Sequence, residues 1–222
     1  MTLGIVAAEA YDLAPYARRL SSCEGLAAIG RATVHGETAG GDTVRMTAFG
    51  PGFRAAARGA AAILAEGPVD VLISTGTCGA LDRGLRLGEI VVDVRDTQPR
   101  SAPPHRQGVI VSQDRVAWAA AEKQALASEG MAVEMESAAV REAAARHQVK
   151  FACIKCVSDG AEQTLALDFN RYRGADGSFQ KGRIVAAMLA RPFSRIPAIL
   201  ALEGQSRRAA QNLGGFLADC RF

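Results

Sequence analysis

The stretch VDVLISTG, residues 69–76, is an apolar run whose final glycine also begins the glycine-rich segment GTCGAL, residues 76–81. A short run of this kind, rich in β-branched residues, predicts a strand buried inside a sheet. The preceding segment, PGFRAAARGAAAILAEG (51–67), predicts a helix that Gly67 closes. The next apolar segment, GEIVVDV (88–94), predicts a second buried strand.

The same alternation of strands and helices continues in both directions. Further strands are predicted at 3–8, 31–37, 43–49, 109–112 and 150–159, and helices at about 11–20, 114–128 and 137–147. Residues 95–108 read as a polar, proline-rich loop, and the chain from Asp176 onward as mostly helical, interrupted at Pro192 and Pro197. This pattern predicts an α/β fold around a central, buried sheet.

The composition fits an ordinary globular chain. Its 222 residues suit one domain, spanning 1–222, and a formal net charge of +3 is too small to indicate nucleic-acid binding. Five irregularly spaced cysteines predict no disulfide framework, which favours a reducing cytoplasm. The start MTLGIVAAEAY lacks the basic segment of an export signal, and no apolar run reaches membrane-spanning length.

The segment AVEMESAAV, residues 132–140, places Glu134 and Glu136 in an apolar run. Acids are rarely buried unless something pairs with them. These two therefore either face water or hold something polar. Segments STGTCG, EMES and SDG all follow predicted strands, and ligands of α/β sheets bind beyond the carboxyl ends of strands. A site at this edge is expected.

Three segments, STGTCGALDRGLRLGEIVV, VEMESAAV and IKCVSDGA, together resemble the nucleoside phosphorylase and nucleosidase superfamily. Their order and separations are most similar to enzymes that cleave methylthioadenosine and S-adenosylhomocysteine, and the resemblance covers roughly residues 3–160. The tail LARPFSRIPAILALEGQSRRAAQNL is more similar to hopanoid-associated phosphorylases. The resemblance implies a three-layer fold with a mixed, mainly parallel sheet.

The resemblance implies that Glu136 binds the ribose hydroxyls and that Met135 packs against the sugar. A carboxylate can accept two hydrogen bonds from a vicinal diol in fixed geometry. The alternative is a surface glutamate at the start of the helix 137–147, where the helix dipole favours an acid.

The resemblance also implies that Asp159 protonates or hydrogen-bonds N7 of the leaving purine. Such an acid needs a pKa raised by burial. A helix cap is the alternative role for this segment, and Ser158 either orients Asp159 or caps.

The family's hydrolases activate water with a glutamate shortly after the first strand. Counting without gaps places Asp12 there, whereas sliding by three residues offers Glu9. Either acid could also simply begin a helix. The remaining candidates for substrate contact are Glu134, Gly76, Thr77, Cys78, Gly79 and Val116. Thr77 takes a position that contacts phosphate, water or sugar, and Val116 takes that of an aromatic that stacks on the base.

These residues imply cleavage of the N-ribosidic bond of an adenine-type nucleoside, by nucleosidase-like hydrolysis. Phosphorolysis, even of a lipid-linked nucleoside such as adenosylhopane, is the alternative, with phosphate as second ligand. A nucleoside-binding protein without turnover is a further alternative. No metal or organic cofactor is expected, because the chemistry is proton transfer and electrostatic stabilisation. A homo-oligomer, a dimer or larger, is implied.

Some positions depart from the family pattern. Thr75 replaces an arginine that holds phosphate in hexameric phosphorylases, and Lys155 replaces another arginine and could attract an anion. The loop at 96–107 is shorter than the one that covers the nucleosidase site. The apolar and basic tail could face a membrane surface, but a helix docked on the sheet with exposed arginines is favoured.

Overall fold

The computed structural model describes residues 1–30, 32–174 and 177–222. Arg31, where one strand was predicted to begin, and Asp176, where the C-terminal helical region was predicted to begin, lie outside the described residues. The strands are β1 (Thr2–Ala7), β2 (Ser22–Glu24), β3 (Val34–Glu37), β4 (Thr43–Ala48), β5 (Val71–Ser74), β6 (Thr77–Ala80), β7 (Ile90–Asp93), β8 (Arg106–Gly108), β9 (Ile110–Ser112), β10 (Ala132–Glu134) and β11 (Lys150–Asp159). The helices are α1 (Ala10–Ala17), α2 (Phe53–Ala65), α3 (Ala120–Leu126), α4 (Ser137–Arg146), α5 (Lys181–Leu189) and α6 (Pro192–Asp219), with short 3-10 turns η1 (Leu26–Ala28) and η2 (Phe169–Tyr172).

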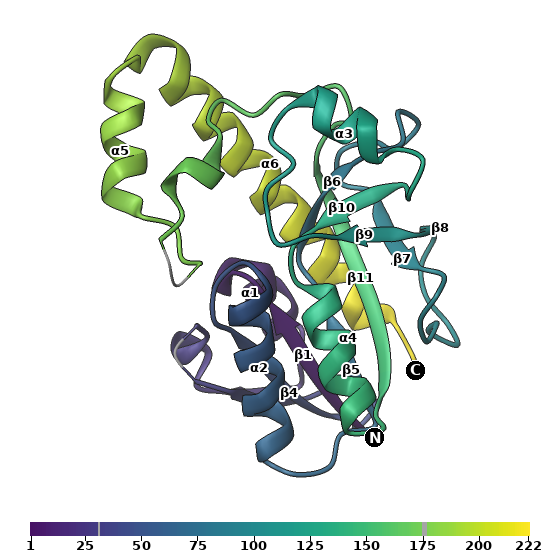
Figure 1. The fold of residues 1–222 in the computed structure, drawn as a ribbon. Coiled ribbons are helices and arrows are strands. Elements are labelled where there is room, and N and C mark those ends of the chain that lie inside the picture. Colours follow the sequence, from purple (N-terminus) through teal and green to yellow (C-terminus); the bar gives the residue numbers. More distant parts are fainter. Residues whose placement is uncertain (31, 175–176) are drawn as a thin grey trace.

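The described strands form one sheet in the order β2-β3-β4-β1-β5-β11-β6-β10-β9, with β7 and β8 branching from β11 (Figure 1). The central pairs β4–β1, β1–β5, β5–β11 and β11–β6 are parallel. Antiparallel pairs join β2 to β3, β3 to β4, β7 to β11 and β6 to β10. The predicted α/β fold with a mixed, mainly parallel sheet is confirmed.

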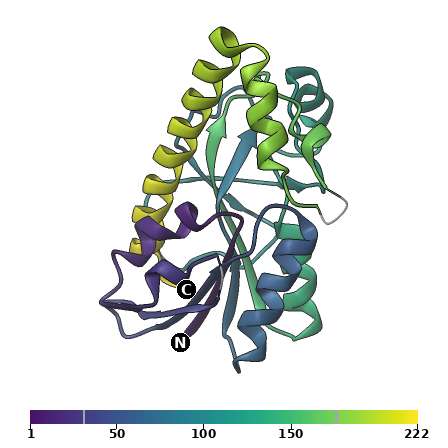
Figure 2. The same ribbon diagram turned by 90° about the vertical axis from the view of Figure 1, so that its left-hand side faces the viewer.

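Helices cover both faces of the sheet, which gives the three layers (Figure 2). On one face, α1 and the second half of α6 bury residues such as Leu13, Tyr16 and Leu213 against the strands. On the other face, α2 and α4 bury Ile63 and Val140. Because both faces are covered, the central strands read as nearly continuous apolar runs.

Two predicted segments differ from the structure near the site. The glycine-rich loop after residue 76 is in fact the strand β6, which pairs with β11 and β10. The helix predicted from Asp114 begins only at Ala120. The reason is that the side chain of Asn170 forms two hydrogen bonds with the backbone of Val116. Asn170 Oδ1 accepts from the N–H of Val116 at 2.8 Å, and Asn170 Nδ2 donates to its carbonyl at 2.9 Å, which holds that segment extended.

The C-terminal region also differs from its prediction. Pro192 starts α6, as expected of a proline in a first turn, but Pro197 does not interrupt it. The helix loses only the bond to the carbonyl of Phe193, in a part exposed to water. The polar segment predicted as a loop at 95–108 contains the short strand β8 at its end. Within the described residues, no helix combines the length and apolarity needed to cross a bilayer.

Candidate active site

A cavity of about 230 Å³ lies at the carboxyl ends of the strands. All the predicted site residues except Gly76 line it: Glu9, Asp12, Thr77, Cys78, Gly79, Val116, Glu134, Met135, Glu136, Ser158 and Asp159. They come from the start of α1, from β6, from the ends of β10 and β11 and from the segment before α3. The structure therefore brings together five segments that are far apart in the sequence.

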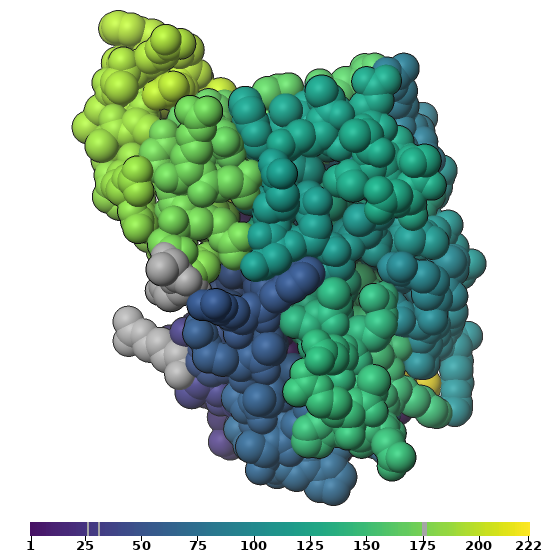
Figure 3. Space-filling view, in the orientation of Figure 1, coloured from purple at the N-terminus to yellow at the C-terminus, as the bar shows by residue number. Residues whose placement is uncertain are grey.

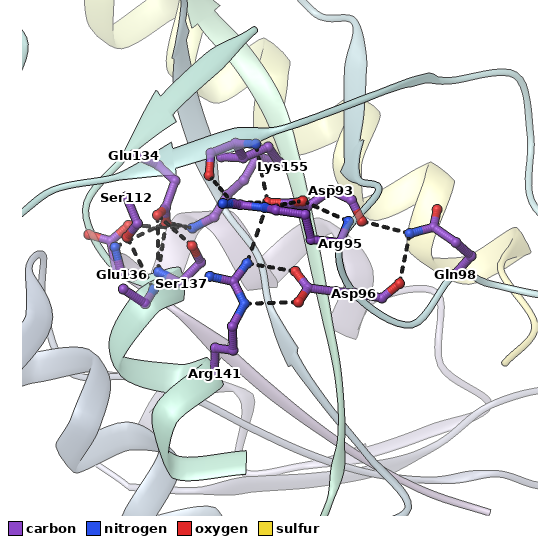
Figure 4. Close-up of polar contacts among 12 residues, drawn as sticks. Asp93, Arg95, Asp96, Gln98, Ser112, Glu134, Glu136, Ser137, Arg141 and Lys155 are labelled. Carbon is purple, nitrogen blue, oxygen red and sulfur yellow. Dashed lines mark hydrogen bonds and ion pairs between the residues drawn. The ribbon is translucent and has the colours of Figure 1, made fainter. Parts of the chain in front are cut away.

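Glu134 is an orienting group within the cavity wall (Figure 4). Its carboxylate accepts hydrogen bonds from Ser137 Oγ at 2.7 Å and from the N–H of Glu136 at 3.0 Å. Lys155 Nζ lies 2.8 Å from Glu134 Oε2. Burial alone would raise the pKa of Glu134, but Lys155 and the hydroxyl donors lower the pKa to about 2. Glu134 is therefore a permanent anion that fixes the turn into α4.

Glu136 lies beside this pair and is also buried, at 5% exposure. Its Oε1 accepts from the N–H of Gly52 at 3.0 Å, and its Oε2 lies 3.4 Å from Lys155 Nζ. Burial raises its pKa, the charge of Glu134 adds to that effect, and Lys155 opposes it. The surface position considered from the sequence is wrong, because Glu136 faces the cavity.

Lys155 is fully buried, and its charge is shared by Glu134 and Glu136. Burial lowers its pKa, but the two carboxylates outweigh this and raise the pKa above the ordinary value. Its ammonium also donates to the carbonyl of Thr75 at 3.1 Å. The idea that Lys155 attracts a free anion therefore does not hold, since its charge is already paired.

Asp12 is the most deeply placed acid of the site, at 1% exposure in the first turn of α1. Its Oδ2 accepts from the N–H of Glu9 at 3.1 Å, while its buried Oδ1 has no hydrogen-bond partner among the described residues. Burial raises the pKa of Asp12 to about 7, against the opposing effects of the Glu9 N–H and Lys155. Glu9 is only half-buried, and burial raises its pKa as well.

Two glycines allow these groups to approach the backbone. Gly76 has φ +123°, and a Cβ there would lie 3.3 Å from Asp12 Oδ2. A Cβ at Gly79 would lie 2.9 Å from Asp159 Oδ2, which is closer than real side chains come. Between them Thr77 is half-buried on the cavity wall, whereas Thr75 turns inward and donates to the carbonyl of Ile154 at 3.0 Å.

Asp159 ends β11 with both of its carboxylate oxygens engaged. Ser158 Oγ donates to Oδ1 at 2.8 Å, so Ser158 orients Asp159. Lys123 Nζ donates to Oδ2 and also to the carbonyls of Gly160 at 2.9 Å and Gln163 at 3.1 Å. Asp159 does not cap a helix, because no helix follows β11 directly.

Lys123 is the functional candidate that the sequence did not indicate. It lies on α3, is fully buried, and uses its three N–H donors on Asp159, Gly160 and Gln163. In the sequence it is one lysine in an alanine-rich helix, 36 residues before Asp159, and such lysines are usually exposed.

A second cavity of about 610 Å³ adjoins the first and shares Glu9, Thr77, Val116 and Asp159 with it. Its outer wall consists of Phe169 and Phe179, whose rings meet edge to face at 6.0 Å, and of residues from α5 and α6. The 95–105 loop does not line either cavity among the described residues; instead Arg100 donates to the carbonyl of Arg221 at 2.7 Å. The site is thus covered by the C-terminal region.

The fold is similar to that of solved nucleosidases. A 5′-methylthioadenosine/S-adenosylhomocysteine nucleosidase from Neisseria meningitidis, in complex with methylthio-immucillin-A, superimposes with a TM-score of 0.70 at 22% identity, covering 98% of this chain and 97% of that one. The nucleosidase from S. pneumoniae superimposes with a TM-score of 0.65 at 22% sequence identity, and the match covers 99% of both chains. Futalosine hydrolase from Helicobacter pylori superimposes with a TM-score of 0.67 at 16% sequence identity, and the match covers 98% of this chain and 95% of that one.

At the level of sequence, one family matches the chain, and its description is the phosphorylase superfamily. The match comprises residues 2–95 and 93–190, which is most of the 222 residues and includes every candidate site residue and Lys123. The chain belongs to the phosphorylase superfamily.

Proposed function

We propose that the protein hydrolyses the N-ribosidic bond of an adenine-type purine nucleoside. The observation that carries the proposal is the placement of three acids in three different environments around one cavity: Asp12, Glu136 and Asp159. Burial raises the pKa of Asp12 to about 7, and a buried acid with a strongly shifted pKa beside a cavity is typical of acid–base catalysis. The nucleosidases and the futalosine hydrolase of similar fold are themselves hydrolases by name, which supports the same reaction class here.

In this proposal Glu136 holds the ribose. Its Oε1 accepts one bond in the structure, so a lone pair remains for a sugar hydroxyl. Met135, half-buried on the same wall, packs against the sugar. The adjoining cavity, lined by Phe49, Val116 and Leu165 among others, accepts an apolar 5′-substituent.

The leaving base is stabilised by Asp159, in contact with Lys123 and Ser158. As the bond from C1′ to the purine N9 breaks, the Asp159 carboxyl transfers its proton to N7 and takes up the negative charge, and the ammonium of Lys123 pairs with the carboxylate that remains. The transition state is oxocarbenium-like, as in glycoside cleavage generally.

The nucleophile is a water molecule activated by Asp12. The water oxygen forms the new bond to C1′, and its proton passes to the Asp12 carboxylate. A pKa of about 7 suits this role, because a base is most effective when its pKa is near the working pH. Glu9 is the less favoured base, because it is only half-buried at the wider end of the site.

Phosphorolysis is the second candidate, favoured by the name of the superfamily. Against it, Thr75 is turned into the sheet and offers no cation to phosphate. The homo-oligomer and the cytoplasmic location stay predictions.

A panel of nucleosides tests the proposal. Methylthioadenosine, S-adenosylhomocysteine, adenosine and inosine are incubated with the protein with and without phosphate, and free base and sugar are measured. We expect adenine and free sugar at the same rate in both conditions. Sugar 1-phosphate formed only with phosphate would establish phosphorolysis, and no base release from any member would contradict the proposal.

Replacing Glu136 with glutamine tests the ribose contact. The amide keeps the size but removes the charge, so we expect kcat/KM to fall by about 10²-fold or more, because hydrogen bonds to charged acceptors are the strong ones. The melting temperature should change little, and a 2′-deoxynucleoside should show a much smaller loss than the ribonucleoside. Turnover near that of the wild type in Glu136→Gln would refute the assignment.

A further inference from the structure

A helical hairpin formed by α5 and the first half of α6 stands away from the body of the molecule (Figure 3). Four of the large exposed apolar side chains lie on it: Val185 at 52%, Leu189 at 64%, Phe193 at 97% and Leu200 at 58% exposure. Val185 and Leu189 are four residues apart on α5, and Phe193 and Leu200 are seven apart on α6, so each pair shares one face of its helix. The hairpin therefore presents two apolar stripes to solvent.

The tip of the hairpin carries only positive charge, and the first acid of α6, Glu203, pairs with Arg207 at 2.7 Å. Residues 177–202 contain Lys181, Arg183, Arg191 and Arg195 and no acidic residue. Lys181, Arg183 and Arg191 are exposed, and Arg195 joins the two helices through a 2.7 Å bond from its Nη1 to the carbonyl of Ala187. Apolar residues flanked by arginines on an amphipathic helix are typical of segments that lie in the interface of a membrane.

We propose that the tip of this hairpin docks on an anionic lipid surface, with Leu189 and Phe193 entering the interface and Arg191 meeting the lipid headgroups. Charge complementarity selects this occupant. A symmetric contact between the tips of two hairpins would place cations opposite cations, with no acid in residues 177–202 to offset them. An anionic bilayer accepts both the apolar tip and the surrounding cations.

The hairpin is mounted rigidly enough to carry such a contact. The second half of α6 is docked on the sheet, with Ala210, Leu213 and Leu217 buried. At Gly214 a Cβ would lie 2.7 Å from Pro15 Cβ, so the helix crosses α1 in close contact. The docked helix predicted from the sequence is thus confirmed for this half, and the membrane contact is the proposal for the other half.

The docking tip is separate from the cavity. The hairpin lines the second cavity through Lys181, Ile184, Leu202 and Ser206, whereas neither Leu189 nor Phe193 lines it. Changes at the tip should therefore alter lipid binding without altering turnover of a water-soluble nucleoside.

Co-sedimentation with vesicles tests the proposal. The wild type is mixed with vesicles of phosphatidylcholine alone or of phosphatidylcholine with anionic phosphatidylglycerol, at low and at high salt. We expect binding to the anionic vesicles that weakens with salt, because screening acts on the arginines. Phe193→Ser should weaken binding by about tenfold or more, since a whole aromatic side chain leaves the apolar phase. Arg191→Gln should weaken it by about fivefold.

The matched control is Leu87→Ser, which removes an apolar side chain of 49% exposure outside the hairpin. It should bind vesicles as the wild type does, and all variants should keep the wild-type melting temperature. Absence of binding to anionic vesicles at low salt overturns the proposal. So does binding that Phe193→Ser leaves unchanged, or an equal loss in Leu87→Ser. A dimer seen by light scattering that Phe193→Ser dissociates, without lipid binding, would assign the tip to a second copy instead.

Discussion

Asp159→Asn is expected to lower kcat/KM by about 10²–10⁴-fold, the usual range for the loss of a general acid. Asparagine keeps the shape of the side chain and can donate a hydrogen bond to N7, but it cannot transfer a proton. Substrate binding should therefore persist while the chemical step slows. The measurement is steady-state kinetics on an adenine nucleoside, with binding followed separately by titration of a non-hydrolysable analogue.

Nucleosides with different leaving bases show whether Asp159 transfers a proton or only positions the substrate. A nucleoside with an activated base needs less protonation, so Asp159→Asn should lose much less activity on it than on adenosine. Equal losses on both substrates would mean that Asp159 only positions the substrate.

Lys123 requires a companion variant. Removing the charge of Asp159 leaves the buried ammonium with only the carbonyls of Gly160 and Gln163, and breaking a buried ion pair costs about 3–5 kcal/mol. The double variant Asp159→Asn with Lys123→Met restores neutrality and should melt above Asp159→Asn alone. Lys123→Met alone should shift the pH profile and lower kcat more than it raises KM, while Lys123→Arg restores part of the rate. An unchanged pH profile in Lys123→Met would leave Lys123 a purely structural role.

Asp12→Asn is the second change with a large expected effect. The base must be ionised, so kcat/KM of the wild type should rise with pH through about 7, the pKa that burial gives Asp12. The variant should lose about 10²-fold or more at pH 8 and lose the dependence near pH 7. Glu9→Gln, as the matched control, should retain that dependence. If Glu9→Gln loses the pH dependence near 7 and Asp12→Asn retains it, Glu9 and not Asp12 is the base that activates water.

The same substitution should stabilise the fold at high pH. The folded-state pKa of Asp12 lies above its ordinary value of 3.8, so the folded state binds more protons between these values and wild-type stability falls as the pH rises from about 4 to 7. Asp12→Asn removes this penalty. Its unfolding free energy should exceed that of the wild type by a few kcal/mol at pH 8, on the order of 1.36 kcal/mol per pKa unit, and by little at pH 4. Urea unfolding at both pH values measures the difference. An equal gain in unfolding free energy at pH 4 and pH 8 would contradict the idea that the buried charge of Asp12 destabilises the wild type.

The alternation of strands and helices was predictable because strands covered on both faces are apolar throughout. Strand β11 has the predicted bounds, and β3 and β4 lie within the predicted ranges 31–37 and 43–49. The start of α3 was not predictable, because the side chain of Asn170, distant in sequence, fixes Val116. The passage of α6 through Pro197 likewise depends on exposure, which the sequence does not contain.

Within the site, the sequence predicts the residues that belong to a motif but not the residues that pair with them in the folded structure. Glu136 follows β10 and Asp159 ends β11, both in recognisable segments, whereas Lys123 reaches Asp159 only through tertiary packing. The sequence indicates only that Lys155 could attract an anion, because its pairing with Glu134 depends on the positions of β10 and β11 on either side of β6. Buried pairs of this kind are properties of the three-dimensional arrangement.

Strand β11 has a consequence for how the molecule can move. Its first residues pair with β5, its middle ones with β7, and its last ones with β6, so one strand belongs to both halves of the sheet. A hinge between the halves would have to break this strand, which also carries Lys155, Ser158 and Asp159. A hinge between the two halves is therefore not expected to admit substrate or release product, and the amides of β11 should be among the last to exchange with solvent deuterium.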